Sequence, residues 1–165
     1  MTLAPLARLL IAAALLATGC AAKPPPQVDR LELTGGWGLA DGSLTVHLQR
    51  DGKGIFEAMD LNAIPLKKTG SFTISPERFA GIVVELETAR RDARPISDID
   101  FALEPCTASD RVSDAGGFYI HWTGPGLDQH VSYNFGCDYK RHKERNARLD
   151  AILNGLPIPR PKDAG

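Results

Sequence analysis

The sequence predicts an α+β domain in which an antiparallel sheet, built from two strand-strand-helix units, carries two helices packed on one face. Several short runs alternate apolar and polar residues, a pattern typical of half-buried strands. Two other segments repeat apolar residues at helical spacing, one near the middle of the chain and one near its end. Each helical segment follows a group of strands, and this order favours helices gathered on one side of an antiparallel sheet.

The first group of strands lies in the N-terminal half of the domain. Gly35 and Gly36 interrupt the alternation after its first run. Asp51 and Gly52 separate two later runs, and both residues tolerate the positive φ that a tight hairpin turn requires. The expected strands cover residues 31–33, 44–49, 54–59 and 70–74.

The first helix begins at a clear capping sequence. Ser75 is placed to accept hydrogen bonds from first-turn amides, Pro76 suits the first helical position, and Glu77 complements the positive end of the helix dipole. The helix is expected to end before Pro95. Its apolar stripe consists of Phe79, Ile82, Val83 and Leu86.

The second group of strands and the second helix follow a polar stretch. Alternating runs at 118–122 and 131–135 flank a turn at 123–128 that contains two glycines and a proline. Asp138 is placed to cap the second helix, and Asn154-Gly155 is a stop signal. The inward face of this helix is expected to consist of Leu149, Ile152, Leu153 and Leu156.

The N-terminal segment is typical of a secretory signal that ends in lipid attachment. Arg8 is its only charged side chain, an apolar run covers residues 9–16, and Ala17-Thr18-Gly19 precede Cys20. This arrangement resembles the bacterial lipoprotein signal, which implies that Cys20 is diacylated and becomes the first residue of the mature protein. A cleaved signal without lipid is the alternative. The apolar stretch is shorter than the roughly 20 residues that a transmembrane helix requires.

The signal predicts both the domain boundaries of the chain and its subcellular location. We expect a signal peptide at 1–19, a lipid-attachment site with a proline-rich tether at 20–29, a single globular domain at 30–160 and a flexible tail at 161–165. In the lipoproteins that this leader resembles, an aspartate after the lipidated cysteine retains the protein at the inner membrane. Because Ala21 stands there, the resemblance implies lipid anchoring at the periplasmic face of the outer membrane.

The two remaining cysteines fit an exported protein. Cys106 and Cys137 are the only possible pair once Cys20 carries lipid, and an oxidising compartment favours a structural disulfide between them. A metal or redox pair is the alternative, although no second cysteine lies two or three positions from either residue.

The domain also resembles a family of short bacterial envelope lipoproteins whose function is unassigned. The resemblance is carried by Asp51-Gly52 in a hairpin, the helix start at 75–77, Ser113-Asp114 before a second hairpin, and a terminal helix. Members of that family often carry a Cys-x-x-x-Cys-Pro segment where this chain has 35–40, which contains neither cysteine nor proline. The resemblance therefore implies a fold and a location, without a metal or redox site in that segment.

Two histidines form the first candidate binding site. If the second hairpin turns symmetrically about Pro125 and Gly126, His121 faces His130 across the strands. Opposed imidazoles could bind a metal or repel each other when protonated, and a solvated strand face is the alternative.

Two further candidates involve cations and an aromatic residue. Trp37 stands among glycines, either as an interface anchor or as a cap on the core. A cluster of basic residues at the start of the second helix opposes the helix dipole, so it could bind an anionic polymer or lipid phosphates instead of remaining a solvated face. Its residues are Lys140, Arg141, Lys143 and Arg145.

The sequence favours a non-catalytic binding or envelope-maintenance module. It has no Gly-x-Ser-x-Gly elbow, no His-Glu-x-x-His and no phosphate-binding glycine loop. No cofactor is expected, and a formal net charge of −1 argues against a nucleic-acid partner. The expected partners are a membrane, through the lipid, and an envelope protein or anionic envelope polymer. The alternatives are a small metal- or carboxylate-dependent hydrolase acting on an envelope polymer, and a pH- or metal-responsive binder built on His121 and His130.

Overall fold

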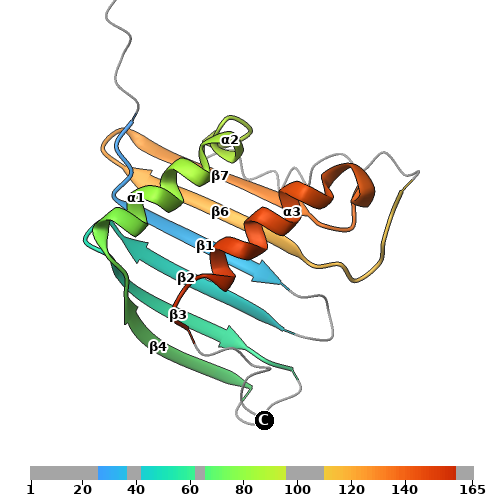
Figure 1. Cartoon of the computed structure of the whole chain (residues 1–165), viewed down its shortest axis with the longest axis horizontal. Helices are drawn as coiled ribbons and strands as arrows, with labels where there is room; N and C mark the ends of the chain where they lie inside the picture. Colours follow the sequence, from blue (N-terminus) through green and yellow to red (C-terminus); the bar gives the residue numbers. More distant parts are fainter. Residues whose placement is uncertain (1–25, 37–41, 62–65, 96–109, 159–165) are drawn as a thin grey trace, which may run out of the picture.

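The structure, a computed structural model, describes residues 26–36, 42–61, 66–95 and 110–158. It confirms the prediction of an α+β domain with an antiparallel sheet (Figure 1). The strands of the described residues are β1 (Arg30–Gly36), β2 (Ser43–Gln49), β3 (Lys53–Met59), β4 (Lys67–Thr73), β5 (Arg94–Pro95), β6 (Gly117–Gly124) and β7 (Leu127–Asn134). The helices are α1 (Pro76–Glu85), α2 (Glu87–Arg90) and α3 (Tyr139–Asn154).

The strands form one sheet in the order β4-β3-β2-β1-β6-β7-β5. β1 lies at its centre and pairs antiparallel with β2 on one side and β6 on the other. The first four strands therefore form a meander, and the β6–β7 hairpin joins it beside β1. This long-range pairing brings residues 30–36 next to residues 117–123.

β1 runs through the glycines that the sequence analysis treated as an interruption. Gly35 pairs with Leu44 on one side and with Phe118 on the other. A Cβ atom at Gly35 would lie 2.6 Å from a methyl group of Leu153 in α3. The glycine is therefore there because a helix packs closely on the strand, which a sequence pattern alone does not reveal.

The first hairpin turn agrees with the sequence, and the second is shorter than the predicted turn at 123–128 because both strands extend into that segment. Gly52 has a φ of 86°, and a Cβ atom there would collide with the Ile74 carbonyl group, so only glycine fits. Between β6 and β7, Pro125 and Gly126 form the turn, with Gly126 at a φ of 67°. The predicted register is confirmed, because His121 lies opposite His130.

The start of α1 is confirmed in detail. The Ser75 hydroxyl group accepts a hydrogen bond from the Arg78 amide at 3.1 Å, and Pro76 is the first helical residue. Phe79, Ile82 and Leu86 are buried against the sheet. Helical structure ends at Arg90, before Pro95 as expected.

The predicted cap of α3 is wrong in its mechanism. Asp138 occupies the N-cap position with a φ of 43°, but its side chain makes no capping hydrogen bond. Instead, the Asp110 carboxylate accepts a hydrogen bond from the Lys140 amide at 2.7 Å. The left-handed backbone at Asp138 leaves the capping task to a residue from a distant segment.

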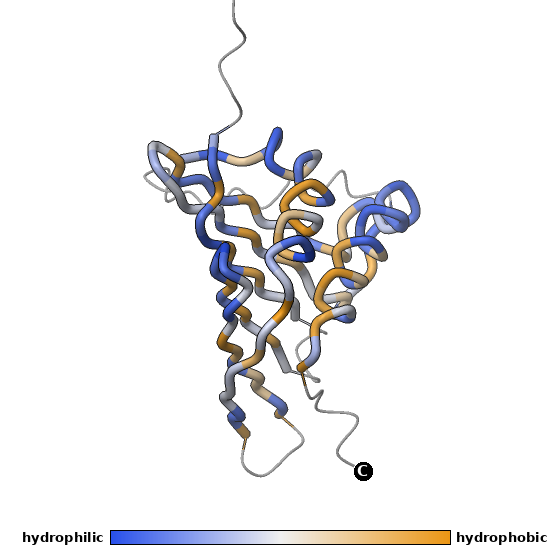
Figure 2. The backbone as a smooth tube through the Cα atoms, turned by 60° about the vertical axis from the view of Figure 1, so that its left-hand side comes forward, coloured by the Kyte–Doolittle hydropathy of each residue, from blue (hydrophilic) through white to orange (hydrophobic). Residues whose placement is uncertain are grey.

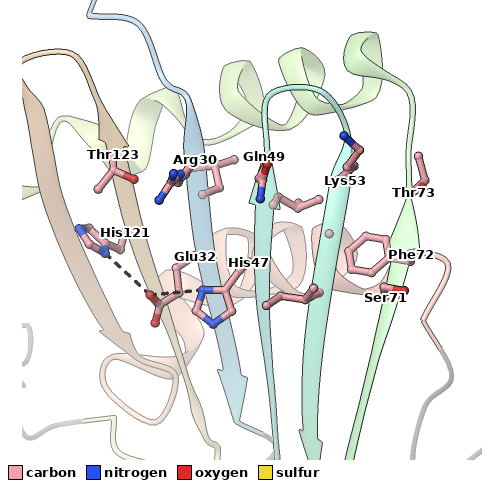
Figure 3. A pocket seen from close by; sticks show the side chains of 14 residues that line it. Arg30, Glu32, His47, Gln49, Lys53, Ser71, Phe72, Thr73, His121 and Thr123 are labelled. Carbon is pink, nitrogen blue, oxygen red and sulfur yellow. Dashed lines mark ion pairs between the residues drawn. The ribbon is translucent and has the colours of Figure 1, made fainter.

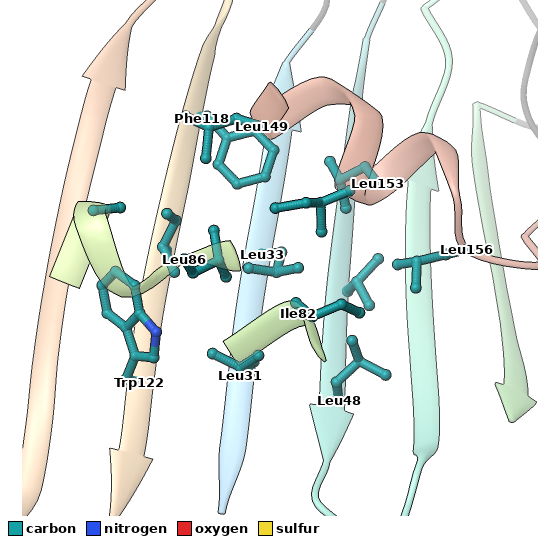
Figure 4. Packing of buried hydrophobic residues seen from close by; sticks show 14 of the residues in the cluster. Leu31, Leu33, Leu48, Ile82, Leu86, Phe118, Trp122, Leu149, Leu153 and Leu156 are labelled. Carbon is teal, nitrogen blue, oxygen red and sulfur yellow. The ribbon is translucent and has the colours of Figure 1, made fainter. Parts of the chain in front are cut away.

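The core lies between the sheet and the helices, which cover the same face in Figures 1 and 4. Leu31, Leu33, Ile120 and Trp122 have at most 1% of their surface exposed. The expected inward residues of α3 are also buried, namely Leu149, Ile152, Leu153 and Leu156. In Figure 2 the apolar stretches of the helices contrast with the hydrophilic first turns of α3.

None of the helices in the described segments is both long and apolar enough to cross a membrane.

Candidate functional site

The face of the sheet opposite the helices, which we call the open face, carries the polar residues of the alternating strands. One row of residues crosses the whole sheet in register on this face. In order across the sheet it consists of Ser71, Ile55, His47, Glu32, His121, His130 and Arg94. Ionisable side chains therefore lie side by side because of strand pairing, although they come from five different strands.

Glu32 is the centre of this row. Its Oε2 atom lies 3.7 Å from Nδ1 of His47 and 3.8 Å from Nδ1 of His121. The two imidazole rings flank the carboxylate from opposite sides (Figure 3). The Glu32 side chain is one-third exposed, and no hydrogen bond formed within the described part of the chain ends on its carboxylate. It therefore faces outward as an available acceptor.

His121 is held in place by a second carboxylate. Its Nε2 atom lies 2.7 Å from Oδ1 of Asp128, and its side chain is 17% exposed. When the neutral ring donates its proton to Asp128, Nδ1 presents a lone pair toward Glu32. In this tautomer His121 donates no hydrogen bond to Glu32.

Tyr119 completes the cluster on β6 and β7. Its ring contacts His130 edge-on at a centroid separation of 5.9 Å and lies 6.4 Å from the ring of His121. Burial raises the pKa of Tyr119, and the negative charges of Glu32 and Asp128 raise it further. The phenol therefore stays protonated over the neutral range and can donate a hydrogen bond.

A groove of about 820 Å³ lies over β1 to β4 and β6 on the open face. Around Glu32 it is lined by both acceptors and donors, with Arg30, Gln49 and Lys53 toward one end (Figure 3). Ile55, with 57% of its surface exposed, supplies apolar contact area in the same groove. This combination suits a polar ligand that carries hydrogen-bond donors and an acidic group.

The basic residues of α3 do not join this site, because α3 packs on the opposite face of the sheet. Lys140, Arg141 and Lys143 are exposed. Their exposure fits both an anion-binding site and a solvated helix face. Arg145 differs. Its guanidinium group stacks 4.2 Å from the centre of the Tyr133 ring and donates a hydrogen bond to Asn146 at 3.1 Å. Arg145 therefore contributes to packing within the domain, and the binding role predicted for the basic residues of α3 stays a prediction.

Three other predicted residues lie outside the described segments: Cys20, Trp37 and Cys106. Cys137 is buried, with 3% of its surface exposed, and it is disulfide-bonded. Its pairing with Cys106 stays a prediction.

Glu32, His47 and Arg30 were not predicted from the sequence as site residues. Their outward parity could be read from the alternating leucines and valine around them. Their proximity to His121 could not, because it depends on the pairing of β1 with β6. Glu32 and His121 are about ninety positions apart, and no local sequence pattern indicates that two such distant strands pair.

No group of three or more His, Cys, Asp or Glu side chains is arranged to hold a metal ion in the residues that the structure describes. No protein-family model matches the chain, and comparison with curated proteins yields no match.

Proposed function

We propose that this chain is a lipid-anchored envelope protein at the periplasmic face of the outer membrane, where it acts as a non-catalytic binding or envelope-maintenance module. Its leader and Cys20 support the location. The proposal includes a disulfide between Cys106 and Cys137, and a fold organised as two strand-then-helix units. The open-face groove is the proposed binding site.

The observation that carries the binding role is the partly exposed carboxylate of Glu32, which receives no hydrogen bond from the residues that the structure describes. An ionised carboxylate is a strong hydrogen-bond acceptor, and a ligand donor that reaches it forms a charge-assisted hydrogen bond. Within the described residues its closest charged partners are imidazole nitrogens beyond hydrogen-bond distance. A ligand with an ammonium, amide or hydroxyl group would supply the missing donor, and Arg30 could bind an acidic group of the same ligand.

This chemistry fits an envelope polymer or an envelope protein segment that carries both donors and acids. The folded domain would meet such a ligand beside the membrane, because the tether at 20–29 is short.

Site-specific photo-crosslinking in intact envelopes tests the proposal. A photoreactive residue at Ile55, in the groove, should capture a discrete product. The same residue at Val84, which is also exposed but lies on α1, is the matched control. Glu32→Gln should reduce the product from Ile55, whereas Glu144→Gln on α3 should not. Equal capture from Ile55 and Val84 would refute the groove as the binding site.

The hydrolase remains the second candidate because Asp128 and His121 form a close acid-base pair beside Glu32. Binding and turnover of the captured polymer, measured for wild type and Glu32→Gln, distinguish the two functions. A hydrolase would still bind the polymer but lose turnover, whereas a binding module shows no turnover in the wild-type protein either.

A further inference from the structure

The two edges of the sheet differ in how well they are protected from further pairing. β5 is two residues long and contains Pro95, which cannot donate to a ladder. β4 has seven residues without proline, and among the described strands only β3 pairs with it. A long edge strand of this kind is a template for another strand.

The direction of the free backbone groups in β4 follows from its pairing with β3. The amides of Ile74 and Asp60 donate to Gly52 and Leu66 just beyond the two ends of the ladder. Hydrogen-bonded positions alternate in an antiparallel pair, so the even-numbered residues of β4 bond to β3. The odd-numbered residues direct their N–H and C=O groups away from the sheet. These residues are Lys67, Thr69, Ser71 and Thr73.

We propose that β4 pairs antiparallel with β4 of a second copy of this chain, with Gly70 opposite Gly70. In this register Thr69 faces Ser71 of the second copy, and Lys67 faces its Thr73. Both of these pairs join odd-numbered residues, so outward-directed groups meet outward-directed groups and about eight ladder hydrogen bonds can form along the two strands.

The charges of β4 favour this register over its neighbours. Its two lysines, Lys67 and Lys68, stand at one end of the strand, so antiparallel pairing about Gly70 places them at opposite ends of the interface. Lys68 then faces Phe72 of the second copy, whose half-buried ring can be covered by the lysine stem. A register shifted two residues toward the lysines opposes Lys67 with Thr69 and Lys68 with itself, which repels.

The parity of the pairing also fixes the geometry of the dimer. Odd-numbered residues of β4 lie on the open face in both copies, so the two sheets continue each other with both open faces on the same side. The helices of both copies lie on the other side. The dimer does not depend on what the groove binds.

A cysteine pair tests the register in the full-length chain purified in detergent. Facing residues of a hydrogen-bonded pair lie about 5.5 Å apart between Cα atoms, within the range of a disulfide. The double variant Thr69→Cys/Ser71→Cys should form a covalent dimer under mild oxidation much faster than either single variant. Single and double variants that crosslink at equal rates would overturn the proposed register.

A proline variant tests the pairing itself by sedimentation analysis. Thr69→Pro removes an outward N–H group that the proposed dimer uses and the monomer does not, so dimerisation should weaken about tenfold or more. Thr69→Val keeps the N–H group and should dimerise like wild type. A wild-type chain that stays monomeric at all concentrations, or that pairs only with a different protein through β4, would overturn the proposal. If Thr69→Pro fails to fold by circular dichroism, the cysteine pair alone decides.

Discussion

The two faces of the sheet are made from alternate residues of the same strands, yet they differ in almost every physical property. Leu33 is completely buried beneath the helices, while its neighbour Glu32 faces the groove on the other side. On the covered face, side chains fill a continuous apolar core. On the open face, ionisable groups stand in a row with few internal partners. Alternate residues of one strand therefore serve different purposes: those on the covered face stabilise the fold, and those on the open face are available for binding.

The largest expected effect concerns the covered face. Trp122→Ala removes a side chain with 0% exposure and should lower the free energy of unfolding by about 3–5 kcal/mol. Trp122→Phe should lose less, because it keeps an aromatic ring in the core and the indole Nε1 atom that it removes has no hydrogen-bond partner among the described residues. Denaturant unfolding measures both. A loss below about 1 kcal/mol for Trp122→Ala would contradict the account of the core.

An intermediate effect concerns the attachment of α3 to the covered face. Asp110→Ala removes the carboxylate that accepts from the Lys140 amide and should cost about 1 kcal/mol of unfolding free energy. Asp110→Asn keeps an acceptor oxygen and should recover most of the loss. Thermal unfolding of the three proteins makes the comparison, and equal stability of Asp110→Ala and wild type would show that the cap is dispensable.

A smaller effect of opposite sign is expected at Asp150 on α3. Burial raises the pKa of this carboxyl group above its usual value of 3.8. Below pH 3.8 the group is protonated in both the folded and the unfolded chain, so wild type and Asp150→Asn should be equally stable. As the pH rises, the unfolded chain ionises first, and wild type loses stability relative to the variant.

The difference should level off above the raised pKa and stay small, because the side chain is partly exposed and solvent screens its charge. Unfolding measured from pH 3 to pH 7 tests this pattern. A difference that is largest at low pH would contradict it.

Local features of the fold could be predicted from the sequence, because they depend on neighbouring residues. The Ser75 cap, the turn at Gly52 and the pairing of His121 with His130 are of this kind. Asp110 as the cap of α3 could not be predicted, because its partner lies thirty positions away. For the same reason the sequence indicated the outward parity of Glu32 without revealing that His121 would lie beside it.

A comparison of Glu32→Gln with Leu33→Ala tests whether the open face binds while the covered face stabilises the fold. We predict that Glu32→Gln stays within about 0.5 kcal/mol of wild type in stability but loses photo-crosslinking from Ile55. Leu33→Ala should lose about 2–5 kcal/mol, while its folded fraction still crosslinks. If Glu32→Gln crosslinks as well as wild type, the open face is not the binding face and the proposed division between the two faces is wrong.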